Sequence, residues 1–308
     1  MIKIKFIIFF LLIIFHQKSF AVENKIILKI DNEIITTIDI KNEYRYLTTL
    51  NKNFKEIEKN KALKIAKNSI IKEKIKKIEL EKNINIDDIN NDVLDQILKN
   101  IYNKLNIYNI DDFEKYLNNH QLELDYVQDK IKIETLWNEL IYKKYNSKIK
   151  INIDQIKEEI IKGDKNKLKS YLLSEIVFTP KNKKEFESQV YIINNSIMKN
   201  GFEKTAYEYS ISETANNGGK LDWIEENVLN KLILENLNKI TVGKHTNPIR
   251  IPQGFIILKI EDMQKTEKDI DFNNEIKKII KFRTNEQLNQ FSKIFYEKIK
   301  KDIEINEL

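Results

Sequence analysis

Apolar residues recur at helical spacing along most of the first half of the chain. In the stretch 54–81, isoleucines and alanines return mostly every three to five residues, and lysines and glutamates fill many positions between them. This spacing gathers the apolar side chains on one face of a helix. The pattern predicts helices over about 38–50, 54–81, 87–105, 124–145 and 153–162, with a short helix that opens at Asp111.

Strand signals precede this helical region. Residues 25–31 predict a strand, the next residues a turn, and Ile34 begins a short return strand. Thr37 then stands where a helix N-cap belongs, with Asp39 early in the first turn, where a negative charge suits the helix dipole.

The second half of the chain follows a different pattern. The polar stretch 163–169 predicts a linker. After it the sequence predicts a strand at 170–178, helices at 183–199, 202–209 and about 228–236, and a closing strand at 253–260. This order within one short stretch of chain is typical of a compact α+β unit.

The tail predicts one more long helix, from about 270 to 299, and 302–305 is compatible with a short strand. Its apolar residues form two stripes, which are Ile276, Ile279 and Ile280, and then Phe291, Ile294, Phe295 and Ile299. A free helix would expose these stripes to water, so we expect the tail to dock on the rest of the chain.

The N-terminus has the features of a secretory signal. Lys3 and Lys5 precede an unbroken apolar run of ten residues, and Ser19-Phe20-Ala21 supplies small residues where a signal peptidase cleaves. The alternative is an uncleaved membrane anchor, for which the apolar run is short. Cleavage after residue 21 would remove three lysines and no acid, so the net charge of +6 would fall to +3.

Composition narrows the classes of function. The chain is 32% charged and 41% hydrophobic, which is normal for a soluble globular protein. Lysines alternate with acids and arginine is rare, which argues against nucleic-acid binding. The chain has no cysteine, and its two scattered histidines outside the signal make no zinc site. No glycine-rich phosphate loop is visible, so we expect no ATP. With no metal-binding pattern either, we expect no cofactor.

Two segments carry the most specific signal. They are Ser210-Ile-Ser-Glu-Thr-Ala-Asn-Asn-Gly-Gly-Lys-Leu-Asp-Trp223 and Val242-Gly-Lys-His-Thr-Asn-Pro-Ile-Arg-Ile-Pro-Gln-Gly-Phe-Ile-Ile-Leu-Lys-Ile260. Together they resemble the signature segments of parvulin-type peptidyl-prolyl isomerases. Four glycines and a proline stand where that family has them. The resemblance implies a parvulin-like α+β domain over 170–262.

The resemblance also implies the residues of a site. Glu175 and Ile256 stand where catalytic parvulins have histidines, Ser212 replaces the central Cys or Asp, and Thr246 keeps the usual Ser or Thr. The catalytic candidates are therefore Glu175, Ser212 and Thr246, and the peptide-binding candidates are Leu221, Leu229, Ile233, Phe255 and Ile256. The side chain of Ile256 cannot form a hydrogen bond, so the isomerase activity is open. For Leu229 and Ile233, a role in the core is at least as good an interpretation.

The N-terminal region, 22–165, resembles the helical domain of SurA-type periplasmic chaperones in its opening strand pair and the helices after it. The resemblance implies a multi-domain protein: a mainly α-helical N-terminal chaperone domain, a small α+β parvulin-like domain, and a C-terminal helix within 263–308 that packs on the first domain. The expected function is that of a periplasmic chaperone for unfolded outer-membrane proteins or proline-containing peptides, without stable membrane insertion after signal cleavage. Two alternatives stay open: an active isomerase, and a membrane-tethered foldase that retains 1–21.

Overall fold

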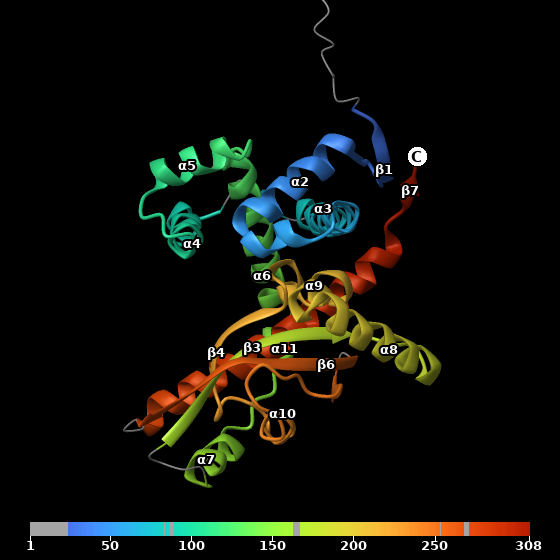
Figure 1. Ribbon diagram of the computed structural model, residues 1–308. Coiled ribbons are helices and arrows are strands. Elements are labelled where there is room, and N and C mark those ends of the chain that lie inside the picture. Colours follow the sequence, from blue (N-terminus) through green and yellow to red (C-terminus); the bar gives the residue numbers. More distant parts are fainter. Residues whose placement is uncertain (1–23, 83, 87–88, 163–166, 253, 268–270) are drawn as a thin grey trace, which may run out of the picture.

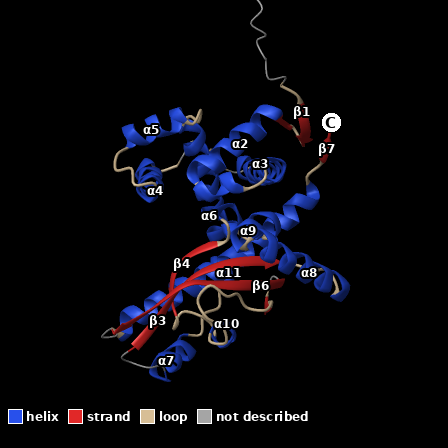
Figure 2. Cartoon of the chain, viewed as in Figure 1, coloured by secondary structure: helices blue, strands red, loops and turns tan. Residues whose placement is uncertain are grey.

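The structure is a computed structural model that describes residues 24–82, 84–86, 89–162, 167–252, 254–267 and 271–308. The expected signal segment lies outside these residues. Helices form the upper part of the molecule, and a twisted sheet with its own helices forms the lower part (Figures 1 and 2). A long helix runs past the sheet and connects the two parts.

The first part begins with two strands and continues with helices. Its elements are β1 (Ile26–Ile30), β2 (Glu33–Thr36), α2 (Thr37–Leu50), the 3-10 helix η1 (Lys52–Glu56), α3 (Lys59–Glu81), α4 (Asn91–Lys104), α5 (Ile110–Asn119), α6 (Leu124–Tyr145), the 3-10 helix η2 (Asn146–Lys148) and α7 (Ile153–Lys162).

Local capping explains where two of these helices begin. Thr36, not Thr37, is the N-cap of α2: its hydroxyl accepts from the Asp39 amide at 3.3 Å, and the Asp39 carboxylate accepts from the Thr36 amide at 2.7 Å. This is a capping box, which satisfies two amides that the helix leaves free. The long helix expected over 54–81 is divided, because the Asn51 side chain caps η1 instead, and α3 starts only at Lys59.

The second part is an α+β domain. Its elements are β3 (Lys167–Phe178), α8 (Lys183–Asn200), α9 (Phe202–Tyr209), the 3-10 helix η3 (Glu213–Asn217), β4 (Lys220–Glu225), α10 (Lys231–Leu237), β5 (Ile249–Ile251) and β6 (Gly254–Glu267). The strands form an antiparallel sheet of order β4-β3-β6-β5. Strand β3 begins inside the stretch expected as a linker, and β6 extends beyond the expected boundary at 262.

The tail consists of α11 (Phe272–Asp302) and β7 (Ile305–Glu307). Strand β7 pairs with β1 in a sheet of order β2-β1-β7, so the C-terminus returns to the beginning of the described chain. Trp137 of α6 stacks on Phe295 of α11 at 5.5 Å and donates to Ser292 Oγ at 2.8 Å. Docking of the tail on the helical part is therefore confirmed.

Two details of that docking differ from the expectation. Ile294 is 60% exposed and takes no part in the core. The stripe at Ile276, Ile279 and Ile280 packs on α7 and on Val228 of the α+β domain. Helix α11 is thus shared: its first half contacts α7 and the α+β domain, and its second half contacts α3 and α6 (Figure 1).

Candidate functional site

The loop after α9 carries a chain of hydroxyl groups that ends on a carboxylate of β3. Ser210 Oγ lies 3.0 Å from Ser212 Oγ, which lies 2.7 Å from Thr214 Oγ1. The Thr214 hydroxyl donates to Glu175 Oε1 at 2.8 Å. The structure therefore brings Glu175 and Ser212 together, as the sequence predicted. Thr214 joins them and was missed, although hydroxyls at every second residue from 210 to 214 could have indicated it.

Backbone contacts hold this loop against β3. The Val177 amide donates to Ser210 Oγ at 3.0 Å, and the Glu175 amide donates to the Gly219 carbonyl at 2.7 Å. Gly219 has a φ of +76°, and a Cβ there would lie 2.1 Å from the Glu175 carbonyl oxygen. Only glycine permits this approach of two backbones, so Gly219 helps to set the position of the loop beside Glu175.

The carboxyl group of Glu175 is perturbed by its surroundings. Burial raises its pKa, and the hydrogen bonds from Thr214 and Ser212 offset that rise only in part. The charge of Glu175 also acts on Glu286 of α11. Burial raises the pKa of Glu286 to about 7, against the lowering effect of Arg283, and the charge of Glu175 adds to the rise. A carboxyl group with a raised pKa keeps its proton, and so its ability to donate a hydrogen bond, to higher pH.

The apolar candidates lie mostly in the interior of the α+β domain. Leu229, Ile233 and Ile256 are 7%, 6% and 7% exposed and share one cluster. Leu221 is partly buried against that cluster, as is Phe282 of α11. The three buried residues therefore serve as core, and Leu221 is the member of the set with the most accessible side chain on this face.

Phe255 and Thr246 do not join the hydroxyl chain or this cluster. Phe255 packs against Phe178 and Phe186, with ring centroids 5.8 Å and 4.4 Å away, in the cluster beneath α8. Phe255 and Ile256 pack in different clusters, because neighbouring residues of a strand face opposite sides. Thr246 is buried, and its hydroxyl accepts from the Leu258 amide at 3.1 Å, so it fastens its loop to β6.

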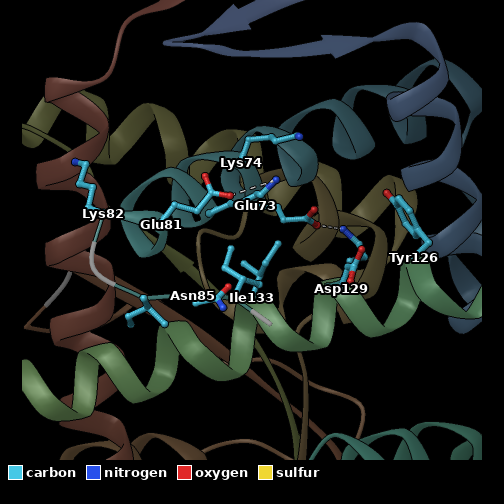
Figure 3. Close-up of a pocket in the computed structure, with 12 residues that line it drawn as sticks. Glu73, Lys74, Glu81, Lys82, Asn85, Tyr126, Asp129 and Ile133 are labelled. Atoms are coloured by element: carbon cyan, nitrogen blue, oxygen red, sulfur yellow. Dashed lines mark hydrogen bonds and ion pairs between the residues drawn. The ribbon is translucent and has the colours of Figure 1, made fainter. Parts of the chain in front are cut away.

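A second feature is an open cavity of about 850 Å³ between α3 and α6 in the helical part. Tyr126, Asp129 and Ile133 rise from α6 toward Glu73 and Glu81 of α3 (Figure 3). The wall combines apolar and charged groups; its other lining residues are Lys74, Lys77, Lys82, Ile84, Asn85, Ile86 and Lys130.

Lys130, at the base of this cavity, belongs to a buried charge cluster. Its ammonium lies 2.6 Å from Glu43 Oε2, pairs with Glu73, and lies over the rings of Tyr46 and Tyr126 at 4.9 Å and 5.3 Å. Burial lowers the pKa of Lys130, but the two glutamates outweigh it and hold the pKa well above its usual value. The sequence analysis missed this cluster, because its members come from three helices.

Comparison with known proteins identifies the second domain. The family model described as the PPIC-type PPIASE domain, a rotamase, matches residues 171–262. Residues 171–262 therefore carry a PPIC-type parvulin domain, joined here to a helical domain. In the part of the chain that the structure describes, none of the helices has the length and apolar character that a membrane crossing needs.

About two thirds of the chain is similar to curated chaperones. It is 24% identical over 214 residues to the Chaperone SurA of Pseudomonas putida, covering 65% of this chain and 50% of that protein. It is 25% identical over 193 residues to the Chaperone SurA of Pectobacterium atrosepticum, covering 59% of this chain and 44% of that protein. The chain spans about half the length of these curated relatives. Together with the rotamase domain, these matches support a SurA-type chaperone with a parvulin domain.

Structural matches were also found. One belongs to a study of PEB4 and Cj1289, described as SurA-like chaperones of Campylobacter jejuni; it has 18% identity, covers 92% of this chain and 99% of that chain, and has a TM-score of 0.36. Another is a PpiC-type peptidyl-prolyl cis-trans isomerase domain, with 26% identity, coverage of 32% and 94%, and a TM-score of 0.28.

Proposed function

We propose that this chain is an exported chaperone that holds unfolded outer-membrane proteins in the periplasm. The observation that carries the proposal is the open cavity between α3 and α6, whose wall mixes isoleucines and Tyr126 with lysines and acids. Strands of outer-membrane barrels alternate apolar and polar residues, so an extended segment of such a protein presents both kinds of group to this wall. The similarity to SurA chaperones supports the same role.

A test of this proposal is the aggregation of a urea-unfolded outer-membrane barrel protein after dilution, followed by light scattering. We expect residues 22–308 at several-fold molar excess to suppress the scattering. Asp129→Trp, at the cavity, should weaken suppression because the indole fills the space that a client would occupy. Lys99→Trp, on an exposed position of α4, is the matched control. No suppression by the unmodified chain, or equal suppression by both variants, contradicts the proposal.

Export rests on residues 1–21 of the sequence, which have the order of a cleavable signal. N-terminal sequencing of the exported protein should therefore start at Val22. A start at Met1 or Ile2 would instead favour the membrane-tethered foldase.

A second candidate function is peptidyl-prolyl isomerisation, favoured by the hydrogen-bonded set of Glu175, Thr214 and Ser212. Rotation about an Xaa–Pro bond has a barrier of roughly 18–20 kcal/mol, and catalysis needs groups that bind the twisted amide better than the planar one. The twisted nitrogen regains a lone pair and accepts hydrogen bonds. A hydroxyl of the chain that ends on Glu175 supplies such a donor without a histidine.

The measurement for this second candidate is the cis-to-trans rate of an Xaa-Pro peptide with and without residues 22–308. If the domain catalyses, Leu221→Asp should abolish the acceleration, since a charge would face the proline ring. Leu232→Asp, half exposed on α10, should not. If the folded protein does not accelerate the reaction, the domain acts only as a peptide-binding module. If the two variants accelerate it equally, Leu221 is not part of the site.

A further inference from the structure

The α+β domain docks on the helical domain through the same segment that carries the hydroxyl chain. Tyr207 of α9 is 5% exposed and stacks edge-to-face on Phe54 of η1 at 5.1 Å. Its hydroxyl also contacts the side chain of Asn51. Next to it, the Asn216 side chain reaches Ser69 of α3 at 3.5 Å. The 3-10 helix η3 therefore lies between Glu175 on one side and α3 on the other.

Along residues 212–214, at the start of η3, successive side chains face the two domains in turn. Ser212 and Thr214 belong to the hydroxyl chain that ends on Glu175. Glu213, between them, faces α3: its Oε1 lies 2.9 Å from Lys72 Nζ and its Oε2 lies 3.5 Å from Lys76 Nζ. Glu213 is thus held by the helical domain, while its neighbours Ser212 and Thr214 belong to the site.

Lys76 is itself held by further contacts within the helical domain. Lys76 is 1% exposed in its side chain, lies 2.7 Å from Glu134 Oε2, and sits over the ring of Trp137 at 5.5 Å. An ammonium that is buried and already paired has little freedom to follow a moving partner. Burial raises the pKa of Glu213, but the charges of Lys72 and Lys76 outweigh it and lower the pKa. The two ammonium groups therefore favour the anionic form of Glu213, and one of them, Lys76, is itself buried and paired with Glu134.

We propose that helix α3 is a structural part of the parvulin site, in which Lys72 and Lys76 act as positioning residues through Glu213. They fix the backbone of the loop 212–214, and this places the Ser212 and Thr214 hydroxyls on the Glu175 side. The site that takes a proline-containing peptide is then complete only while the two domains are docked. This inference rests on the proposed peptide-binding role of that site.

Other ion pairs across the same junction provide a matched control. Lys61 lies 3.2 Å from Glu208 of α9, and Lys204 lies 3.4 Å from Glu56 of η1. Both pairs join the domains, and neither touches the loop 212–214. If Lys72 and Lys76 only aid docking, replacing Lys61 should have the same effect as replacing Lys72. If they position the loop 212–214, only the replacement of Lys72 should change the site.

The first experiment needs no ligand. Amide hydrogen exchange of residues 213–219 is compared in residues 22–308 carrying no change, Glu213→Gln, Lys72→Gln or Lys61→Gln. We expect exchange of these amides to rise about tenfold in the first two variants, as the loss of one charge-assisted hydrogen bond predicts, and to stay unchanged in Lys61→Gln. Equal exchange in Glu213→Gln and Lys61→Gln overturns the proposal. The exchange experiment tests the positioning of the loop whether or not the site binds a peptide.

The second experiment measures the Kd of a fluorescent peptide with one Phe–Pro bond for the same four proteins. We expect Glu213→Gln and Lys72→Gln each to weaken binding about tenfold and the double variant to weaken it no further, because both remove the ion pair between Glu213 and Lys72, the shorter of the two contacts of Glu213. Lys61→Gln should bind normally. Independent, additive losses overturn the proposal. If the unchanged chain binds no peptide, the proposed role of the site fails, and hydrogen exchange alone then decides whether α3 positions the loop.

Discussion

Replacing Lys130 by methionine tests how strongly the buried charge cluster shapes the helical domain. Methionine keeps most of the volume and removes the charge. Glu43, which is fully buried, and Glu73 then lose their shared cation. The hydroxyls of Ser69 and Tyr126 still donate to Glu43, at 2.7 Å and 2.9 Å, but they cannot neutralise it.

The cost follows from the geometry. Removing one partner of a buried ion pair destabilises a protein by about 3–5 kcal/mol, because an uncompensated charge stays in a medium of low polarity. The ammonium also lies over two aromatic rings, and each such contact contributes about 0.5–1 kcal/mol. Burial raises the pKa of Glu73 even with Lys130 present. Without the lysine, Glu73 gains a proton more readily, so the loss of stability is small at acid pH and grows as pH rises through the raised pKa of Glu73.

The assay is urea unfolding of residues 22–308 followed by far-ultraviolet circular dichroism at pH 5 and pH 8. Lys143→Met is the matched control on α6, since the Lys143 side chain is 67% exposed and pairs with the exposed Glu139, so its loss should cost less than about 0.5 kcal/mol. Adding Glu43→Gln and Glu73→Gln to Lys130→Met should restore most of the stability. A loss below about 1 kcal/mol at pH 8 for Lys130→Met alone would refute the reasoning.

Three further predictions follow from single contacts. Gly219→Ala should lower the stability of the parvulin domain by at least about 2 kcal/mol, seen as a lower Tm, because its Cβ would meet the Glu175 carbonyl oxygen at 2.1 Å; an unchanged Tm contradicts this. Glu286 binds its proton more tightly in the folded protein, so stability should fall as pH rises from its ordinary pKa of 4.5 to about 7, and Glu286→Gln should flatten that interval in unfolding curves; parallel curves contradict it. Trp137→Phe leaves the Ser292 hydroxyl without its donor and should cost about 1–3 kcal/mol in urea unfolding, whereas no loss argues against the bond.

Periodicity predicted most of the helical elements, since it acts over a few turns of chain, but the N-cap of α2 is Thr36 and not Thr37, and α3 begins only at Lys59. The stripe of α6 and the docking face of α11 at Phe295 and Ile299 follow directly from apolar spacing. The same reasoning placed Ile294 in the interface, where it is 60% exposed. Spacing gives the direction of a stripe, but the width of the stripe that is buried depends on the partner surface.

The site shows a different limit. Resemblance to parvulins located Glu175 and Ser212, which the structure joins through Thr214. It could not indicate that Glu213, one residue away, contacts Lys72, because the two residues are far apart in sequence and no periodic pattern connects them. The buried pairing of Lys130 was equally hidden: lysines and glutamates between apolar positions normally face solvent, and here tertiary packing encloses three of them.

The central claim is that this chain binds unfolded outer-membrane proteins. The most direct measurement is the equilibrium binding of residues 22–308 to a fluorescently labelled outer-membrane barrel protein kept unfolded in dilute urea, beside an unfolded water-soluble protein of the same length. The account predicts saturable binding of the barrel protein, weakened by Asp129→Trp, and clearly weaker binding of the soluble one. Equal affinity for the two, or no binding of the barrel protein by folded chain, would contradict it.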